Sequence, residues 1–219
     1  MNLRSKRFRS GLAVALLLLL GSSANAAEPA ASATPDVTAA TKVVETLHAA
    51  MLGVMKQGVQ LGYAGRLAKL QPAISAAYDF QFIAEKSVGL AWKDFDAEAR
   101  AKLVDVIGRL AAATYAARMA DFSGERFETI GTEPASQDTL LVRTRIVDAK
   151  DVPIPLDYRL RNTAAGPRVV DVFYDGTVSE LAMRRSEYSA LLKKGGIQAL
   201  LDALEKKTAE QATAKPPAA

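Results

Sequence analysis

Cysteine is absent from this sequence of 219 residues, and histidine occurs only once. The absence of cysteine excludes disulfides, thiol catalysis, cysteine-ligated zinc and iron–sulfur clusters. Stability must then come from an apolar core, which a domain of roughly 170 residues can bury. The sequence also lacks the HExxH, GxSxG, Walker and GxGxxG motifs. We therefore expect no catalytic site, no metal site and no cofactor.

Two features could still suggest chemistry, and each has a simpler structural explanation. The single histidine, His48, lies on a predicted helix, where a lone histidine is more often a surface or interface residue than a catalyst or metal ligand. Asp94 and Asp96 resemble an acid/base pair in their spacing. A loop acid followed by a helix N-cap explains the same two residues, and we favour that interpretation.

Long apolar runs are also scarce, and the one near the N-terminus predicts export. Four basic residues between Arg4 and Arg9 precede the apolar residues 12–20, and Ala24-Asn25-Ala26 supplies a small-x-small cleavage site. The apolar run is shorter than the about 20 residues that a membrane-spanning helix needs. We expect residues 1–26 to be a cleaved Sec-type signal peptide and the remaining chain to be a soluble exported protein.

The remaining chain has no surplus of charge of either sign. Of the 28 lysine and arginine residues four lie in the predicted signal, which leaves 24 against the 24 aspartate and glutamate residues. Long-range attraction to nucleic acid or to anionic lipid depends on a basic surplus. We therefore expect no nucleic-acid partner.

The first half of the chain has helical periodicity, and the second half begins with strand periodicity. We expect Asp36 to cap a first helix, Pro72 to open a short second one, and Asp96 to cap a long helix that ends near Phe122. Alternation of apolar and polar residues then predicts four strands, at 125–133, 138–148, 154–162 and 169–174. The linkers between them are too short for parallel crossovers, so the sheet should be antiparallel.

The segment after the last strand is expected to be helical. Asp175-Gly176 predicts a turn, and Thr177 with Glu180 has the form of a capping box that starts a helix. Gly195-Gly196 should end that helix, and a short last helix should follow. The predicted fold class is α+β, with N-terminal helices, a four-stranded antiparallel sheet and C-terminal helices. We expect a flexible leader at 27–35, a single domain at 36–207 and a disordered tail at 208–219.

Two patterns suggest binding surfaces without deciding what they bind. Large aromatic residues occur in every element with alanine and glycine between them, which fits either an apolar pocket or a solid core. Four arginines, Arg143, Arg145, Arg159 and Arg161, alternate along two neighbouring strands. They could bind a head group or a docking protein, but a solvated face paired with Asp157 and Asp148 is the interpretation we favour.

Several motifs occur in a fixed order over about residues 41–206. They are P-x-I-x-x-x-Y-D at 72–79, G-x-x-W at 89–92, Y-x-L at 158–160, V-x-D-V at 169–172, and Gly176, Ser179, Arg185 and Tyr188 followed by Gly195-Gly196. In this respect the sequence resembles the toluene-tolerance/MlaC-type lipid-binding family. Thr177 lengthens the spacing between Gly176 and Val178-Ser179 by one residue, and Arg184 replaces a usual aromatic. The segment DGTVSELAMRRSEY resembles the hopanoid-biosynthesis-associated (HpnM) branch.

The resemblance implies a function that needs no catalytic group. It implies a periplasmic carrier with an apolar cavity enclosed by sheet and helices, which binds a hopanoid or a phospholipid. The carrier would shuttle this lipid between transport proteins of the inner and outer membranes. The expected lipid contacts face inward: Leu110, Tyr115, Val142, Ile146, Tyr158, Leu160, Val172, Leu181 and Tyr188.

Two alternatives remain open. One is a small enzyme that acts on an apolar substrate, for which Asp79, Asp171 or Asp175 would have to point into the pocket. The other is an adaptor with a solid core that docks a membrane complex through its arginine-bearing strands. A pocket of several hundred Å³ would argue against the adaptor.

Overall fold

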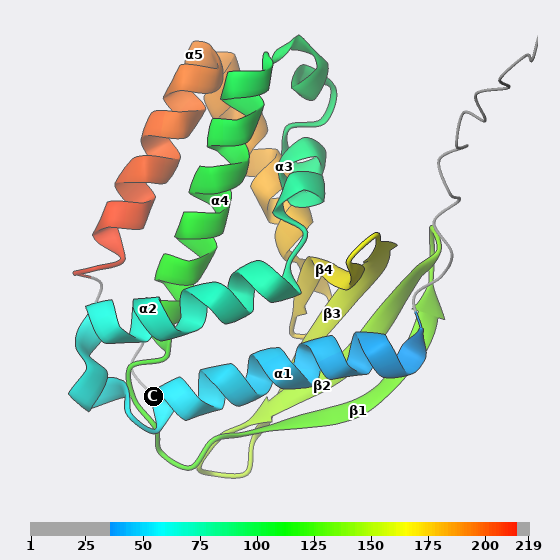
Figure 1. Ribbon diagram of the computed structural model, residues 1–219, viewed down its shortest axis with the longest axis vertical. Coiled ribbons are helices and arrows are strands. Elements are labelled where there is room, and N and C mark those ends of the chain that lie inside the picture. Colours follow the sequence, from blue (N-terminus) through cyan, green and yellow to red (C-terminus); the bar gives the residue numbers. More distant parts are fainter. Residues whose placement is uncertain (1–35, 214–219) are drawn as a thin grey trace, which may run out of the picture. The chain divides into compact units, whose positions relative to one another are not determined.

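The computed structural model describes residues 36–213, and within this range the α+β prediction is confirmed (Figure 1). The predicted signal peptide and leader lie outside the described residues. The helices before the sheet are α1 (Val37–Met55), α2 (Gly58–Ala77), α3 (Phe80–Val88), the 3₁₀ helix η1 (Gly89–Asp94) and α4 (Ala97–Arg118). The rest is β1 (Arg126–Ala135), β2 (Thr139–Val147), β3 (Pro153–Thr163), β4 (Gly166–Tyr174), β5 (Val178–Ser179) and α5 (Glu180–Glu210).

Local sequence signals decide where two of the helices begin. The Asp36 carboxylate accepts a hydrogen bond from the Ala39 amide at 2.8 Å, and Asp96 accepts one from Ala99 at 2.7 Å. Each carboxylate satisfies a backbone amide that lacks a partner inside its helix. The predicted caps of the first helix and of the long helix are therefore confirmed.

The predicted start of the second helix is wrong. Pro72 lies inside α2, which begins at Gly58 and is broken at Gly62, where φ is 60° and ψ is 177°. A proline removes one helical hydrogen bond and disfavours a helix interior. Here Leu70 and Ile74, on either side of Pro72, are completely buried. Their packing holds the segment helical in spite of the proline.

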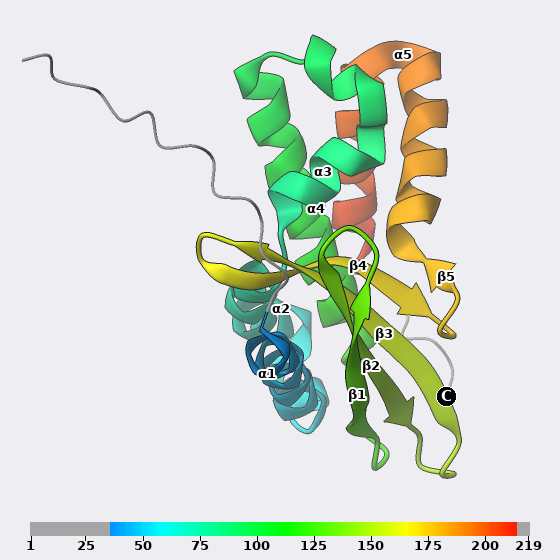
Figure 2. The ribbon, with the colours of Figure 1, turned by 90° about the vertical axis from the view of Figure 1, so that its right-hand side faces the viewer.

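The sheet follows the order β1-β2-β3-β4-β5, and every neighbouring pair is antiparallel. It has one strand more than predicted, the two-residue β5. Its inner face is apolar, and Val142, Tyr158 and Val172 lie opposite one another across β2, β3 and β4. All three are fully buried, and α1 crosses this face of the sheet (Figures 1 and 2). The space between α1 and the sheet is therefore filled by core side chains.

The N-cap of α5 lies two residues after the predicted cap, and the helix doubles back on itself. Val178 and Ser179 still pair with β4, so the chain is extended there, and the Thr177 capping box is wrong. Ser179 is the N-cap, and its hydroxyl accepts a hydrogen bond from the Ala182 amide at 3.0 Å. Gly195 and Gly196 have non-helical backbone angles, with φ of 64° at Gly196. They divide α5 into two halves, 180–194 and 197–210, which run side by side (Figures 1 and 2).

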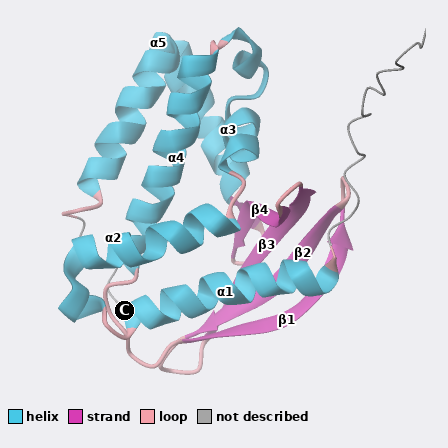
Figure 3. Ribbon diagram, viewed as in Figure 1, coloured by secondary structure: helices cyan, strands magenta, loops and turns pink. Residues whose placement is uncertain are grey.

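The helices α3, α4 and α5 form a layer of their own beside the sheet (Figure 3). Within this layer α4 packs against α3 and α5. Outside it, α4 also packs against α2, and α5 contacts β4. The turn of α5 is where the sequence predicts one helix to end and a last one to begin. The second half continues to Glu210, three residues beyond the predicted end of the domain.

Candidate functional site

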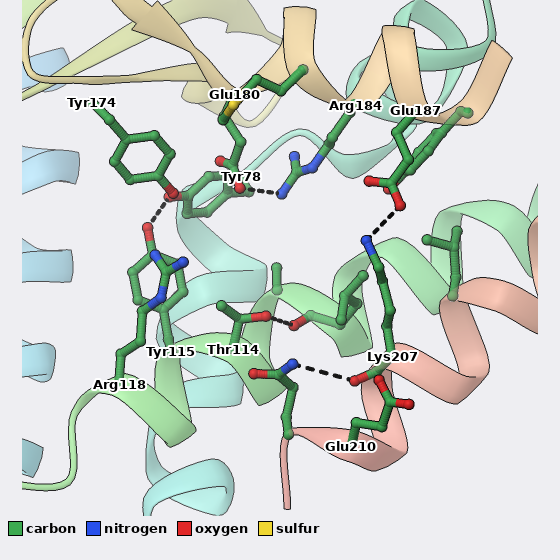
Figure 4. Close-up of a pocket in the computed structure, with 16 residues that line it drawn as sticks. Tyr78, Thr114, Tyr115, Arg118, Tyr174, Glu180, Arg184, Glu187, Lys207 and Glu210 are labelled. Atoms are coloured by element: carbon green, nitrogen blue, oxygen red, sulfur yellow. Dashed lines mark hydrogen bonds and ion pairs between the residues drawn. The ribbon is translucent and has the colours of Figure 1, made fainter. Parts of the chain in front are cut away.

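A pocket lies between α4 and the two halves of α5 and encloses about 460 Å³ (Figure 4). We call it the α4–α5 pocket. Helix α4 contributes Leu110, Ala111, Thr114, Tyr115 and Arg118. The first half of α5 contributes Glu180, Met183, Arg184, Glu187 and Tyr188. The second half contributes Leu204, Lys207 and Glu210, and Gln211 follows directly after it. Tyr78 and Tyr174 complete the lining. Pockets of this volume are typical of small-molecule sites.

Neutral phenol groups form the inner part of the α4–α5 pocket. The hydroxyls of Tyr78 and Tyr115 are 2.7 Å apart, and Tyr188 is almost completely buried. Burial raises the pKa of Tyr188 to about 12, and it also raises the pKa values of Tyr78 and Tyr115. All three phenols therefore stay protonated at neutral pH, and they offer aromatic surface with few hydrogen-bonding groups.

Charged residues surround this aromatic part in equal numbers of each sign. Arg118, Arg184 and Lys207 are balanced by Glu180, Glu187 and Glu210. Arg184 lies 2.8 Å from Glu180, and Lys207 lies 2.5 Å from Glu187 (Figure 4). The pocket thus combines an apolar and aromatic interior with charges that largely neutralise one another.

The structure separates the predicted lipid contacts into three groups. Leu110, Tyr115 and Tyr188 line the α4–α5 pocket. Leu181 lines a different pocket, and Ile146 is half-buried against the core. The other four residues lie on the sheet and line neither pocket. They are completely buried beneath α1 and other core residues: Val142, Tyr158, Leu160 and Val172. Contact of these residues with lipid stays a prediction.

Several lining residues were not predicted from the sequence. On the first half of α5 the spacing of Glu180, Met183, Arg184 and Glu187 places them on one helix face, and that signal could have found them. Leu204 and Lys207 join the site only because α5 folds back at Gly195-Gly196. No local pattern indicates which residues the second half of a helical hairpin brings into contact with the first.

A second pocket of about 700 Å³ is lined by the opposite face of the first half of α5. We call it the Trp92 pocket. Its lining comes from α3, η1, the turn between β1 and β2, the strands β2 to β5, and α5: Phe82, Glu85, Lys86, Gly89, Leu90, Trp92, Lys93, Gln137, Thr139, Arg159, Val170, Asp171, Ser179, Leu181, Ala182 and Arg185. The first half of α5 therefore separates two pockets of several hundred Å³ each, which argues against an adaptor with a solid core.

Two of the three acids required by the enzyme alternative have structural roles. Asp79 caps α3 through the Phe82 amide and pairs with Arg161 at 2.7 Å. Asp175 lies in the turn before β5 and lines neither of these pockets, but it borders a third one, of about 400 Å³, beside β2 and β3. Asp171 borders the Trp92 pocket, but its carboxylate accepts hydrogen bonds from two backbone amides and from the Ser179 hydroxyl. Among residues 36–213 there is no group of three or more potential metal ligands.

His48 is a core residue and lies outside both pockets. Its Nε2 is 3.0 Å from the Tyr158 hydroxyl, and its ring stacks on Phe127 with 4.3 Å between the ring centroids. Burial lowers the pKa of His48 to about 4, so the ring is neutral at pH 7. The expectation of a surface or interface histidine is therefore wrong, because α1 buries this residue against the sheet.

The four strand arginines do not form a continuous basic band. Arg145 pairs with Glu128 and Arg161 with Asp79, each at 2.7 Å, while Arg143 lies 3.9 Å from both Glu133 and Asp157. Asp157 is the predicted partner, whereas Asp148 accepts hydrogen bonds from the backbone of its own loop. Arg159 differs from the other three and lines the Trp92 pocket.

Comparisons with known proteins agree with this architecture. A family model described as MlaC protein matches residues 45–206. A solved structure from Ralstonia solanacearum, described as a phospholipid-binding protein in complex with a phospholipid, superposes with a TM-score of 0.67. The two chains are 22% identical, and the match covers 79% of this chain and 98% of the other. No significant match was found among curated proteins. Within the described part of the chain, no helix has the length and apolar character to cross a bilayer.

Proposed function

The chain belongs to the MlaC family, and on this premise we propose that it is a lipid carrier of the periplasm rather than an enzyme. The observation that carries the proposal is the α4–α5 pocket, whose interior offers apolar and aromatic surface. A lipid that leaves a bilayer loses about 0.8 kcal/mol for each CH₂ exposed to water. A carrier must supply an equivalent apolar environment, and it needs no bond-making chemistry to do so.

We propose that the apolar part of the lipid contacts Leu110, Tyr115 and Tyr188 in this pocket. The balanced charges of the surrounding residues fit a ligand whose polar end carries little net charge or remains in water. The pocket is bounded on one side by the second half of α5, which is joined to the first through Gly195-Gly196. Movement at this glycine turn would widen the pocket for a larger lipid.

The ligand proposed is a phospholipid or a hopanoid. The Ralstonia solanacearum protein of the same fold is described as a phospholipid complex, which supports the first. The segment from Asp175 to Tyr188, with its resemblance to the HpnM branch, supports the second. The partners proposed are lipid-transport proteins of the inner and outer membranes, between which the loaded carrier would move.

The proposed site can be tested with two variants that change charge equally. Met183 is 47% exposed and lines the α4–α5 pocket, so Met183→Glu places a carboxylate where the lipid chain would lie. Ser186→Glu puts the same charge on an exposed position of the same helix that lines neither pocket. Uptake of a fluorescent lipid from vesicles should weaken at least about tenfold in Met183→Glu, because the carboxylate must be desolvated. Equal uptake by the two variants would contradict the proposed site.

A further inference from the structure

The two pockets beside the first half of α5 differ in charge. The α4–α5 pocket carries three basic and three acidic residues. The Trp92 pocket carries four basic residues, Lys86, Lys93, Arg159 and Arg185, against the two acids Glu85 and Asp171. A surplus of positive charge around one cavity attracts anions to it.

The two acids of the Trp92 pocket are already engaged and leave that surplus in place. Glu85 pairs with Lys86 at 2.7 Å. The Asp171 carboxylate accepts hydrogen bonds from the Ser179 hydroxyl at 2.6 Å and from the amides of Leu181 and Val172, each at 2.9 Å. These contacts join the start of α5 to β4, where Asp171 lies opposite Arg159 of β3. With both acids counted, the lining still has a surplus of two basic residues.

The other three cations have no acidic partner within 4.0 Å in the described part of the chain. The guanidinium of Arg159 lies 5.2 Å from the centre of the Phe173 ring, and its Nε is buried without a hydrogen-bond partner. Arg185 is exposed and lies against Gly89, where a built Cβ would be 3.7 Å from the Arg185 Nη2. A buried donor without a partner is costly, so the Arg159 guanidinium has hydrogen-bonding capacity that the protein does not use.

Part of the lining of the same pocket is apolar. The half-buried Trp92 lies in it with Leu181 and Val170, and Leu90 extends it toward solvent with 82% of its surface exposed. Cations without an acidic partner and apolar side chains around one pocket match a molecule with an anionic end and an alkyl chain.

From these observations we infer that the Trp92 pocket binds the anionic head group of an amphiphile. Arg159 and Arg185 bind its phosphate or carboxylate, since a guanidinium can donate two parallel hydrogen bonds to either group. The first carbons of its chain pack on Trp92 and Leu181. This site goes beyond the proposed carrier function, because the α4–α5 pocket has no surplus of charge and lies on the other face of α5.

The chain supplies its own reporter for this site, because Trp92 is its single tryptophan. The delipidated protein is titrated with monomeric dodecyl phosphate while tryptophan fluorescence is recorded, and dodecyl maltoside serves as the uncharged amphiphile. We expect a saturable change with dodecyl phosphate and binding about tenfold weaker in Arg159→Gln and in Arg185→Gln, as each removes a charge-assisted contact. Arg143→Gln, on β2 and outside this pocket, should bind as the unmodified protein does.

Further titrations distinguish the sources of the anion. The protein is also titrated with vesicles of anionic phospholipid and with vesicles of phosphatidylcholine. A fluorescence change with the anionic vesicles only would support a head group presented by a membrane. A response to dodecyl phosphate alone would support a free amphiphile. Saturation by inorganic phosphate without any gain from the alkyl chain would overturn the inference. So would equal affinity for dodecyl maltoside.

The variants guard against a loss of binding that comes from misfolding. Arg185 is exposed, so Arg185→Gln should fold even if Arg159→Gln does not. Unchanged binding in a folded Arg185→Gln protein contradicts the inference. Met183→Glu changes the other pocket and leaves Trp92 as the only tryptophan. This variant can therefore test the two sites separately. If Met183→Glu loses lipid uptake but binds dodecyl phosphate as the unmodified protein does, the two sites are distinct.

Discussion

At the scale of single residues, His48 links the stability of the protein to pH. Its pKa is lowered from 6.5 to about 4 because burial disfavours the charged ring. Between these values the unfolded chain binds a proton that the folded protein does not bind. The free energy of unfolding should therefore fall as the pH is lowered from 6.5 toward 4, by roughly 3 kcal/mol at most from this residue. Denaturant unfolding at several pH values measures the loss.

The matched control for this prediction is His48→Gln. The glutamine amide can still form a hydrogen bond with the Tyr158 hydroxyl, but it does not titrate. The variant should be less stable than the unmodified protein at pH 7, since it loses the stacking on Phe127. The part of the pH dependence that belongs to His48 should disappear. An identical pH profile in both proteins would show that the folded state does not exclude the proton.

Gly58 is a residue whose lack of a side chain is required by a close backbone approach. A Cβ built at Gly58 would lie 2.0 Å from the carbonyl oxygen of Ala120, whereas one at Gly53 would meet nothing within 4 Å. Gly58→Ala should therefore lower the free energy of unfolding by about 1–3 kcal/mol, because the backbone must move. Gly53→Ala, inside α1, should be neutral or stabilise by up to about 1 kcal/mol. Thermal unfolding of the two variants checks both, and equal midpoints would contradict the packing at Gly58.

At the scale of elements, the start of α5 depends on Ser179. Its hydroxyl accepts a hydrogen bond from the Ala182 amide and donates one to Asp171. Ser179→Ala should lower the free energy of unfolding by about 1–2 kcal/mol, since an N-cap and a bond to a buried carboxylate are lost. Thr177→Ala removes an exposed side chain that caps no helix, and should change it by less than about 0.5 kcal/mol. If Thr177→Ala lowers the free energy of unfolding more than Ser179→Ala does, the result would support the capping box predicted at Thr177 from the sequence.

Whether an element could be predicted depended on how local its causes are. Asp36 and Asp96 cap their helices through amides three residues away, so the sequence was sufficient. Pro72 was misleading because the burial of Leu70 and Ile74, a long-range effect, outweighs the cost of the proline. The start of α5 was displaced because Val178 and Ser179 pair with β4, which the capping pattern does not reveal.

At the scale of the whole molecule, the α+β class was predictable because the apolar period changes from helical to alternating near residue 125. The pocket was predictable only in part. Leu110, Tyr115 and Tyr188 were proposed as inward-facing residues and do line it. The sheet residues Val142, Tyr158, Leu160 and Val172 face inward too, but α1 occupies the space above them. Alternation along a strand shows which side chains point inward without showing whether they meet a cavity or another helix.

The most direct test of the carrier proposal is native mass spectrometry of the protein purified gently from its own source. We predict adducts with masses of phospholipids or hopanoids, which lipid extraction and mass analysis would identify. Met183→Glu should lose the adducts, and Ser186→Glu should keep them. A uniformly ligand-free spectrum, together with no uptake of lipid from liposomes by the unmodified protein, would contradict the proposal.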